Sequence, residues 1–399
     1  MSAPTSFAPP VADLAGLGRK GLAAGLVGLA ASGAGFAMAP DRFFRSWLMG
    51  WVFVFGIALG AWAILLVHTL SRGAWGLVVR RTLGAAARTI PLFALFAVPV
   101  LLGLPKLYPW ADAARVAHDE ILHHQSKYLN VPFFLGRLAL YFVVWAGGVR
   151  LVTGLSRRQD TSDDPAGLER KMQAVAGPAL ILHILAVSFF SFDVMMSLNP
   201  HWFSTIYGLY LLGGQAVSGM AFLILAALFL SGREPMSRVL RATHVHDWGK
   251  LLLAFMMLWS YFAFSQFLIV WSGDLPEEIG FFKDRFVGGW GAVALGLVLL
   301  HFAVPFLLLL SRDLKRDVKK LSVVAALLLV MRWIDIWWLA LPAFSPKQLS
   351  FHWLDVAAPV AMGGFFLWAF TTRLASEPLL PARDPNLAAA LEAAEAPHD

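Results

Sequence analysis

Ten apolar stretches of about 20 residues dominate the sequence, and they constrain the fold more than any other feature. A helix of about 20 residues crosses the roughly 30 Å hydrocarbon core of a bilayer. Lipid offers the backbone no hydrogen-bond partner, so each stretch must be helical. The sequence therefore predicts an all-α integral membrane protein with about ten transmembrane helices. The predicted spans are 20–38, 46–70, 86–104, 132–155, 173–197, 206–231, 250–272, 289–310, 321–343 and 353–375.

The composition excludes a soluble enzyme and several kinds of redox centre. Charged residues make up 14% of the chain and hydrophobic residues 58%, whereas soluble domains carry about 25% charged residues. The chain has no cysteine, which excludes disulfides, cysteine-ligated iron–sulfur clusters and covalently attached c-type haem. His68, His183 and His301 lie in or next to different spans and form no repeated pair, so we predict no cofactor and no metal bound by this chain.

The distribution of basic residues predicts the orientation. Of the 32 Lys and Arg residues, 21 flank the spans on the side of the N-terminus and 8 on the opposite side. Basic loops stay in the cytoplasm, so both termini are predicted to be cytoplasmic. This topology also accounts for the net charge of +7, and no nucleic-acid partner is expected. We divide the chain into a cytoplasmic tail (1–19), a ten-helix membrane domain (20–375) and a cytoplasmic C-terminal extension (376–399), which is surface-bound or mobile.

Two aspartates point to an internal repeat. Asp193 and Asp335 each stand seven residues before a proline, Pro200 and Pro342, near the ends of the fifth and ninth spans. The two spans lie four apart in the chain. If the spacing is not a coincidence, spans 2–5 and 6–9 form two four-helix bundles with two flanking helices.

Several ionisable residues lie inside the apolar spans, where a charge is costly unless it is paired, hydrated or functional. Arg332 and Asp335 are three residues apart and share a helix face, so they form either a structural ion pair or a tuned acid that takes up protons. His301 precedes Pro305 by four residues, which removes a donor to its carbonyl and predicts a kink or a buried water site. His183 is either bonded to a neighbouring helix or part of a proton relay.

The seventh span carries polar groups along its length. Those in its apolar part serve either as contacts between helices or as relay hydroxyls. At its N-terminal end, Asp247 is expected to cap the helix, and His246 could collect protons. The polar groups of the apolar part are Ser260, Tyr261, Ser265 and Gln266.

Four strings of unlike residues resemble a known family. They are YLNVPFF at 128–134, DVMMSLNPHWFSTIYG at 193–208, HDWGKLL at 246–252 and YFAFSQFLIVW at 261–271. They are similar to the ActF-type membrane subunit of bacterial alternative complex III, in the NrfD (polysulfide reductase membrane subunit) superfamily. The likeness runs from about Arg80 to Trp290.

The resemblance implies a subunit of a respiratory quinol:electron-acceptor (cytochrome c-type) oxidoreductase in the bacterial inner membrane. The implied partners are an NrfD-like paralogue, a multihaem cytochrome c and an iron–sulfur protein, which hold haem c and the iron–sulfur clusters. The chain itself holds no redox centre but could supply a quinol pocket or a proton path. The family pattern places a carboxylate soon after a basic pair, yet none follows Arg80 and Arg81 before Asp112. This departure disfavours a proton route through the third span.

These observations lead to one hypothesis and two alternatives. The outer loop at 105–131 and the acidic segment 274–278 are candidate docking surfaces for the partners. A secondary transporter and a passive scaffold of the complex stay open as alternatives. The hypothetical proton path, from the cytoplasm outward, consists of His246, Asp247, Tyr261, Ser265, Gln266, His301, Arg332, Asp335, His183 and Asp193.

Overall fold

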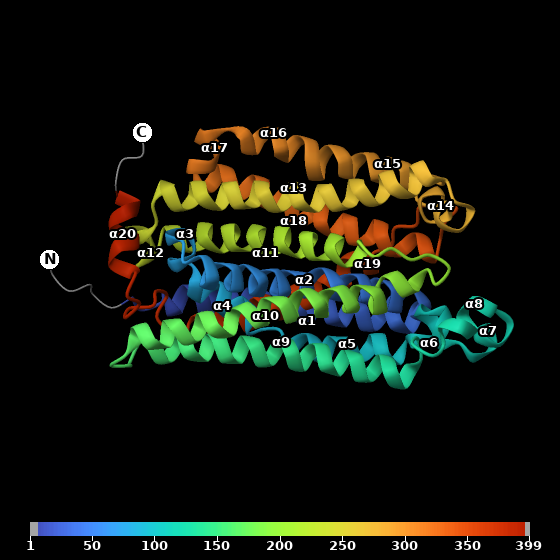
Figure 1. Ribbon diagram of the computed structural model, residues 1–399, viewed down its shortest axis with the longest axis horizontal. Helices are drawn as coiled ribbons and strands as arrows, with labels where there is room; N and C mark the ends of the chain where they lie inside the picture. The colour runs from blue at the N-terminus through green and yellow to red at the C-terminus, as the bar shows by residue number, and fades with distance from the viewer. Residues whose placement is uncertain (1–6, 396–399) are drawn as a thin grey trace.

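The computed structural model describes residues 7–395, which are helical and contain no strand. Ten segments of this range are long and apolar enough to cross a membrane, as predicted, and they run along the long axis of the molecule (Figure 1). The segments are Val11–Met38 (α1), Pro40–Ser71 (α2), Arg80–Leu102 (α4 and α5), Val131–Gln159 (α9), Pro165–Leu198 (α10 and η2), Tyr207–Ser231 (α11), Ala242–Gly273 (α13), Trp290–Leu310 (α15, η3 and α16), Val318–Ala343 (α18 and η4) and Leu354–Leu374 (α19).

Short helices occupy the two ends of the bundle. Figure 1 shows α3 and α20 at the end where both termini lie, here named the terminus side, and α7, α8 and α14 at the opposite end, here named the loop side. The short helices are α3 (Ala74–Leu77), α6 (Leu104–Leu107), α7 (Ala113–His118), α8 (Glu120–Gln125), α12 (Met236–Val239), α14 (Pro276–Lys283), α17 (Arg312–Arg316) and α20 (Leu387–Glu395).

Local sequence signals set the starts of several long helices. Proline occupies the first turn of α2, α9 and α10, where its missing N–H would have no helical partner. The side chain of Asn130 accepts a hydrogen bond from the N–H of Phe133 at the start of α9, at 3.0 Å. Asp164 does the same for the N–H of Gly167 in α10, at 2.8 Å. Such caps satisfy donors that the first helical turn leaves unpaired.

Two helices begin earlier than their apolar stretches. α1 begins at Val11, so part of the predicted tail 1–19 is helical, while residues 1–6 lie outside the described range. α13 begins at Ala242, where the ring of His244 accepts a hydrogen bond from the N–H of Arg241 at 3.3 Å. The expectation that Asp247 caps this helix is therefore wrong. Asp247 lies inside the first turns and pairs with Lys250 at 3.2 Å.

The long helices form two four-helix bundles. α2, α4 with α5, α9 and α10 make the first, and α11, α13, α15 with α16 and α18 make the second. The bundles meet where α2 packs against α11. Gly60 and Gly219 allow this approach, because a Cβ on Gly60 would lie 1.8 Å from the carbonyl oxygen of Gln215. Small residues bring transmembrane helices into backbone contact.

Two flanking helices and the C-terminal extension cover the first bundle. α19 packs on α2, and α1 packs along α19. The extension after α19 is bound to the rest of the molecule: Leu379 and Leu380 are buried, and the N–H of Leu379 donates to the carbonyl of Phe7 at 2.9 Å. Of the two alternatives for this extension, the described part is therefore surface-bound.

Candidate functional site

Asp335 on α18 is the centre of a buried polar cluster, here named the Asp335 cluster. The hydroxyl of Tyr210 on α11 donates to its Oδ1 at 2.6 Å, and the indole N–H of Trp259 on α13 donates to its Oδ2 at 3.1 Å. The guanidinium of Arg332 pairs with the same carboxylate, as the spacing of these two residues predicts. Three helices thus aim O–H and N–H donors at one acid, an arrangement that stabilises the charged form of a carboxylate.

His301 borders this cluster. Its ring centroid lies 3.9 Å from that of Trp259, and its side chain is fully buried. It sits in a π-helical turn, Leu297–Ala303, that ends just before Pro305, which has no N–H to give to the His301 carbonyl. Such turns are frequent at functional sites. Neither ring nitrogen has a hydrogen-bond partner among the described residues.

Asp193 on α10 forms a second cluster, here named the Asp193 cluster, in the first bundle. Arg137 on α9 donates to both carboxylate oxygens at 2.8 Å, and the hydroxyl of Tyr141 donates to Oδ2 at 2.7 Å. Arg137 also donates to the carbonyl of Tyr128 at 2.9 Å. Arg137 and Tyr141 have no predicted role, and the one signal that the sequence carries for them is an arginine four residues before a tyrosine inside an apolar span.

The two clusters resemble each other in position and chemistry. Each aspartate lies on the last long helix of its bundle, followed by a short 3₁₀ turn, Met196–Leu198 or Leu341–Ala343. Each is held by one arginine and one tyrosine. The arginines differ in origin, because Arg137 comes from a neighbouring helix and Arg332 from the same helix as its acid. The sequence repeat thus corresponds to matched surroundings in the two bundles.

A third buried acid, Asp355, joins α19 to the bundles. Arg42 on α2 pairs with it, and the hydroxyl of Ser46 donates to Oδ1 at 2.5 Å. The indole N–H of Trp337 and the backbone N–H of His352 donate to Oδ2 at 3.2 and 3.0 Å. Protein donors from α2, α18 and the loop before α19 satisfy this carboxylate, so it works as a junction between helices.

The remaining residues of the predicted proton path lie apart from the Asp335 cluster. Tyr261 faces outward from α13 and is 63% exposed, whereas Ser265 is half-buried and Gln266 is buried. His246 and Asp247 are half-buried at the terminus side. His183 is buried on α10 with both ring nitrogens unpartnered among the described residues. The structure brings together His301, Arg332 and Asp335, and it places Asp193 in the other bundle.

Arg285 is a buried cation that the sequence analysis passed over. It lies between α14 and α15 and donates to the carbonyls of Phe281 and Leu339 at 2.7 and 2.6 Å. The guanidinium carbon is 3.4 Å from the centre of the Phe281 ring. Burial lowers the pKa of Arg285 from 12.5 to about 10. Because the last carbonyls of a helix favour a cation, this residue fixes the end of α18 close to Asp335.

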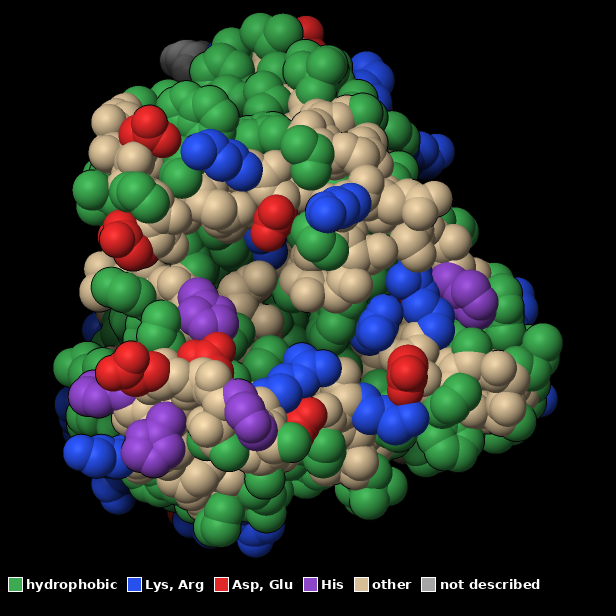
Figure 2. Space-filling view, turned by 90° about the vertical axis from the view of Figure 1, so that its right-hand side faces the viewer, with side chains coloured by type: hydrophobic (Ala, Val, Ile, Leu, Met, Phe, Trp, Pro, Cys, Tyr) green, Lys and Arg blue, Asp and Glu red, His purple; other side chains and the backbone are tan. Residues whose placement is uncertain are grey.

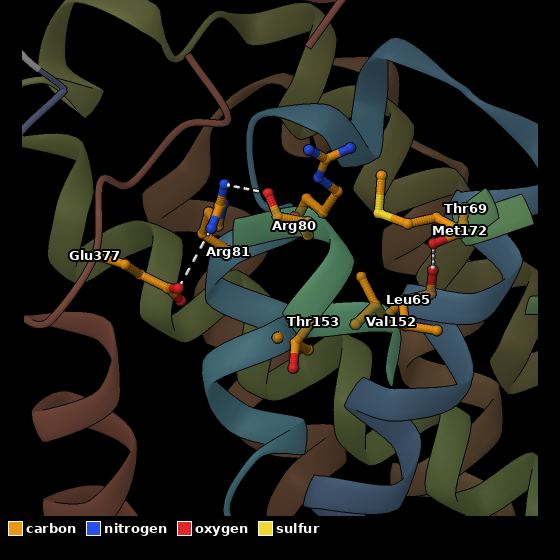
Figure 3. Close-up of a pocket in the computed structure, with 10 residues that line it drawn as sticks. Leu65, Thr69, Arg80, Arg81, Val152, Thr153, Met172 and Glu377 are labelled. Atoms are coloured by element: carbon orange, nitrogen blue, oxygen red, sulfur yellow. Dashed lines mark hydrogen bonds and ion pairs between the residues drawn. The ribbon is translucent and has the colours of Figure 1, made fainter. Parts of the chain in front are cut away.

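A small hollow lies at the terminus side, lined in part by Arg80, Arg81 and Glu377 (Figure 3). Arg81 donates to Asp160 at 2.7 Å and to Glu377 at 3.3 Å, and Arg80 donates to Asp384 at 2.7 Å. No carboxylate follows this basic pair on its own helix. The acids come instead from the loop after α9 and from the C-terminal extension, two segments that are far away in sequence.

The loop side carries the predicted docking surfaces. Figure 2 shows histidine, acidic and basic side chains close together over this end of the molecule. His201 and Asp119 pair there at 2.8 Å. The N–H of Leu122, helped by His201, holds the pKa of Asp119 below its ordinary value of 3.8. His201 is exposed and Asp119 is half-buried, and Asp119 caps the short helix α8.

No protein-family model and no curated protein matches the chain. In residues 7–395 there is also no group of three or more His, Cys, Asp or Glu side chains that could hold a metal ion.

Proposed function

We propose that this multi-span membrane protein is a subunit of a respiratory quinol:electron-acceptor oxidoreductase complex in the bacterial inner membrane, with both termini in the cytoplasm. An NrfD-like paralogue, a multihaem cytochrome c and an iron–sulfur protein are the proposed partners, and they hold the haem c and iron–sulfur centres. The resemblance of four strings to the ActF type supports this proposal. Two of these strings contribute to one site, since Tyr128 and Asp193 both bind Arg137.

The strongest structural support for a proton path is the Asp335 cluster with His301 beside it. A buried acid, its arginine and an imidazole with two unpartnered nitrogens form a group that can take up and release a proton within the membrane. The Trp259 ring separates His301 from Asp335. Transfer between these two groups therefore needs a bridging water molecule or a rotation of the imidazole. We propose that this pair is the central part of the proton path.

The Asp193 cluster suits a different task in the same proposal. Arg137 holds both oxygens of Asp193, and Tyr141 adds a third donor. A bidentate pair of this kind fixes geometry, and it binds α9 to α10. This bidentate pair favours the scaffold alternative for the Asp193 cluster, whereas His183 and His301 both keep ring nitrogens without a partner among the described residues and are the proposed proton carriers.

The first test is the stoichiometry of proton uptake in the reconstituted complex. We expect Asp335→Asn to lower the number of protons taken up per electron, because the amide cannot carry a proton between partners. Asp355→Asn is the matched control, since that buried acid is also held by an arginine but lies on α19, outside both bundles. An unchanged stoichiometry in Asp335→Asn would reject the role of Asp335.

Purification from native membranes tests the assignment to a complex. We expect the tagged chain to carry haem-bearing partners, visible in the absorption spectrum. A chain that purifies alone or only with copies of itself would favour a secondary transporter. Variants of His301 and Asp335 that reduce assembly, but never the turnover of each assembled complex, would favour a passive scaffold.

A further inference from the structure

Arg150 is a charged side chain on the outward surface of a membrane-crossing helix. α9 runs from Val131 to Gln159, and Arg150 lies five residues beyond its middle toward the terminus side, a distance of about 7 Å along the axis. Half of the hydrocarbon core is about 15 Å thick. The backbone of Arg150 therefore lies within the apolar layer, and its side chain is exposed.

No hydrogen bond or ion pair from Arg150 to another described residue is present, in contrast to Arg137 and Arg332, which also lie inside apolar stretches. Arg137 and Arg332 are buried and paired with aspartates. An unpaired guanidinium in hydrocarbon is unfavourable, so a long basic side chain extends toward the nearest polar layer. We therefore expect the guanidinium of Arg150 to bind a partner outside this chain.

Further basic residues continue the same face toward the terminus side. Arg157 follows Arg150 by seven residues, which places it on the same face, about 10 Å closer to the end of the helix. Arg157 and Arg158 are both exposed. Two acids of the adjoining loop are already engaged, because Asp160 binds Arg81 and Asp164 caps α10.

Two glycines flank Arg150 on the outward surface of α9. Gly147 and Gly154 lie three residues before and four residues after it, so all three share one face. A Cβ at either glycine would meet no atom within 4 Å. The exposed side chain of Val143, seven residues before Arg150, lies on the same face. No other part of the described chain therefore covers this face beside Arg150.

We propose that this face of α9 binds an anionic phospholipid, with the phosphate held by Arg150, Arg157 and Arg158. A guanidinium matches phosphate oxygens with two parallel N–H donors. Basic side chains at the edge of a membrane domain are suited to acidic headgroups. The lipid would satisfy the charge of Arg150 at the depth where the side chain ends.

The test measures lipid retention by the purified chain in detergent. Phosphatidylglycerol is the probe, and zwitterionic phosphatidylcholine is the comparison. By native mass spectrometry, we expect wild type to retain phosphatidylglycerol preferentially and Arg150→Leu to lose at least several-fold of this retention. Arg150→Lys should keep part of it. Arg19→Leu is the matched control, because Arg19 is also exposed but lies at the edge of its apolar stretch.

Two further results decide the interpretation. Gly154→Ala on the same face leaves the arginines intact and should retain phosphatidylglycerol like wild type, since the new Cβ would meet no atom within 4 Å. Equal retention by Arg150→Leu and wild type would overturn the proposal. So would a variant that retains lipid as the isolated chain but sheds a membrane subunit from the native assembly, because Arg150 would then pair with a carboxylate of that subunit. No electron or proton transfer is measured, so the outcome is independent of the proposed oxidoreductase role.

Discussion

Buried carboxylates inside the spans are tolerated because each one faces an arginine. Asp193, Asp335 and Asp355 are paired with Arg137, Arg332 and Arg42, respectively. Tyrosine, tryptophan or serine donors complete each group. Removal of one partner leaves an uncompensated charge in a medium that solvates it poorly. The resulting loss of folding free energy is larger than the net contribution of the intact pair to stability. Single substitutions at these residues should therefore have large effects.

At the residue scale, we predict that Arg137→Leu destabilises the protein by about 3–5 kcal/mol, because Asp193 is left buried without its cation. The double variant Arg137→Leu with Asp193→Asn should be less destabilised than the sum of the two single variants. Thermal unfolding in detergent micelles measures both. Arg115→Leu is the control, since its pair with Asp112 is exposed and should be worth less than about 1 kcal/mol. An additive double variant would contradict the prediction.

A second residue-scale prediction concerns pH. Folding lowers the pKa of Asp119 below 3.8, chiefly through the N–H of Leu122. Asp119 is the N-cap residue of α8, so its ionised side chain stabilises α8 above pH 3.8. This stabilisation is lost as the pH falls through the lowered pKa of Asp119 in the folded state. Hydrogen exchange at Leu122 should show less protection at about pH 2.5 than at about pH 6, after correction for intrinsic rates. Asp119→Asn keeps an acceptor and should lose this pH dependence; if the dependence persists, another group causes it.

At the element scale, helix contacts depend on where side chains are absent. α1 and α19 approach along glycines, and a Cβ on Gly28 would lie 2.5 Å from the backbone nitrogen of Ala361. A Cβ on Gly364 would lie 2.3 Å from the nitrogen of Gly25. These contacts involve backbone atoms, which cannot move aside as a flexible side chain can. The glycines thus hold the first helix in place.

We predict that Gly28→Ala pushes α1 away from α19 and destabilises the protein by about 1–3 kcal/mol. Gly33→Ala on the same helix is the matched control, because its Cβ would meet nothing within 4 Å. The control should be neutral or slightly more stable, since alanine is the better helix former. Thermal unfolding of the two variants side by side measures the difference. Equal melting temperatures would show that the contact between α1 and α19 at Gly28 can accommodate a methyl group.

At the scale of the whole molecule, the C-terminal extension holds distant segments together at the terminus side. Glu377 pairs with Arg81 and Arg88, and Asp384 pairs with Arg80. The three arginines belong to the segment Arg80–Leu102, which contains no acidic residue. The end of the chain thus supplies charges that the first bundle needs.

We predict that truncation after Ser376 destabilises the protein by about 3–5 kcal/mol, because it leaves buried arginines without their acids. Truncation after Asn386 keeps both acids and removes only α20, so it controls for the loss of chain. The melting temperatures of the two truncated proteins in detergent give the comparison. A drop of the same size in both would assign the effect to α20 instead of the ion pairs.

The sequence alone determined the number, type and approximate limits of the spans, because a run of apolar residues is a local property that lipid enforces. It also determined the pair of Arg332 and Asp335, which are neighbours on one helix turn. Only the tertiary structure decided that Tyr210 and Trp259 complete that cluster, that Arg137 holds Asp193, that Tyr261 faces outward, and that Glu377 and Asp384 serve Arg81 and Arg80. These pairings depend on how helices rotate and pack, and residues 56 to 304 positions apart in the chain carry no local signal of their meeting.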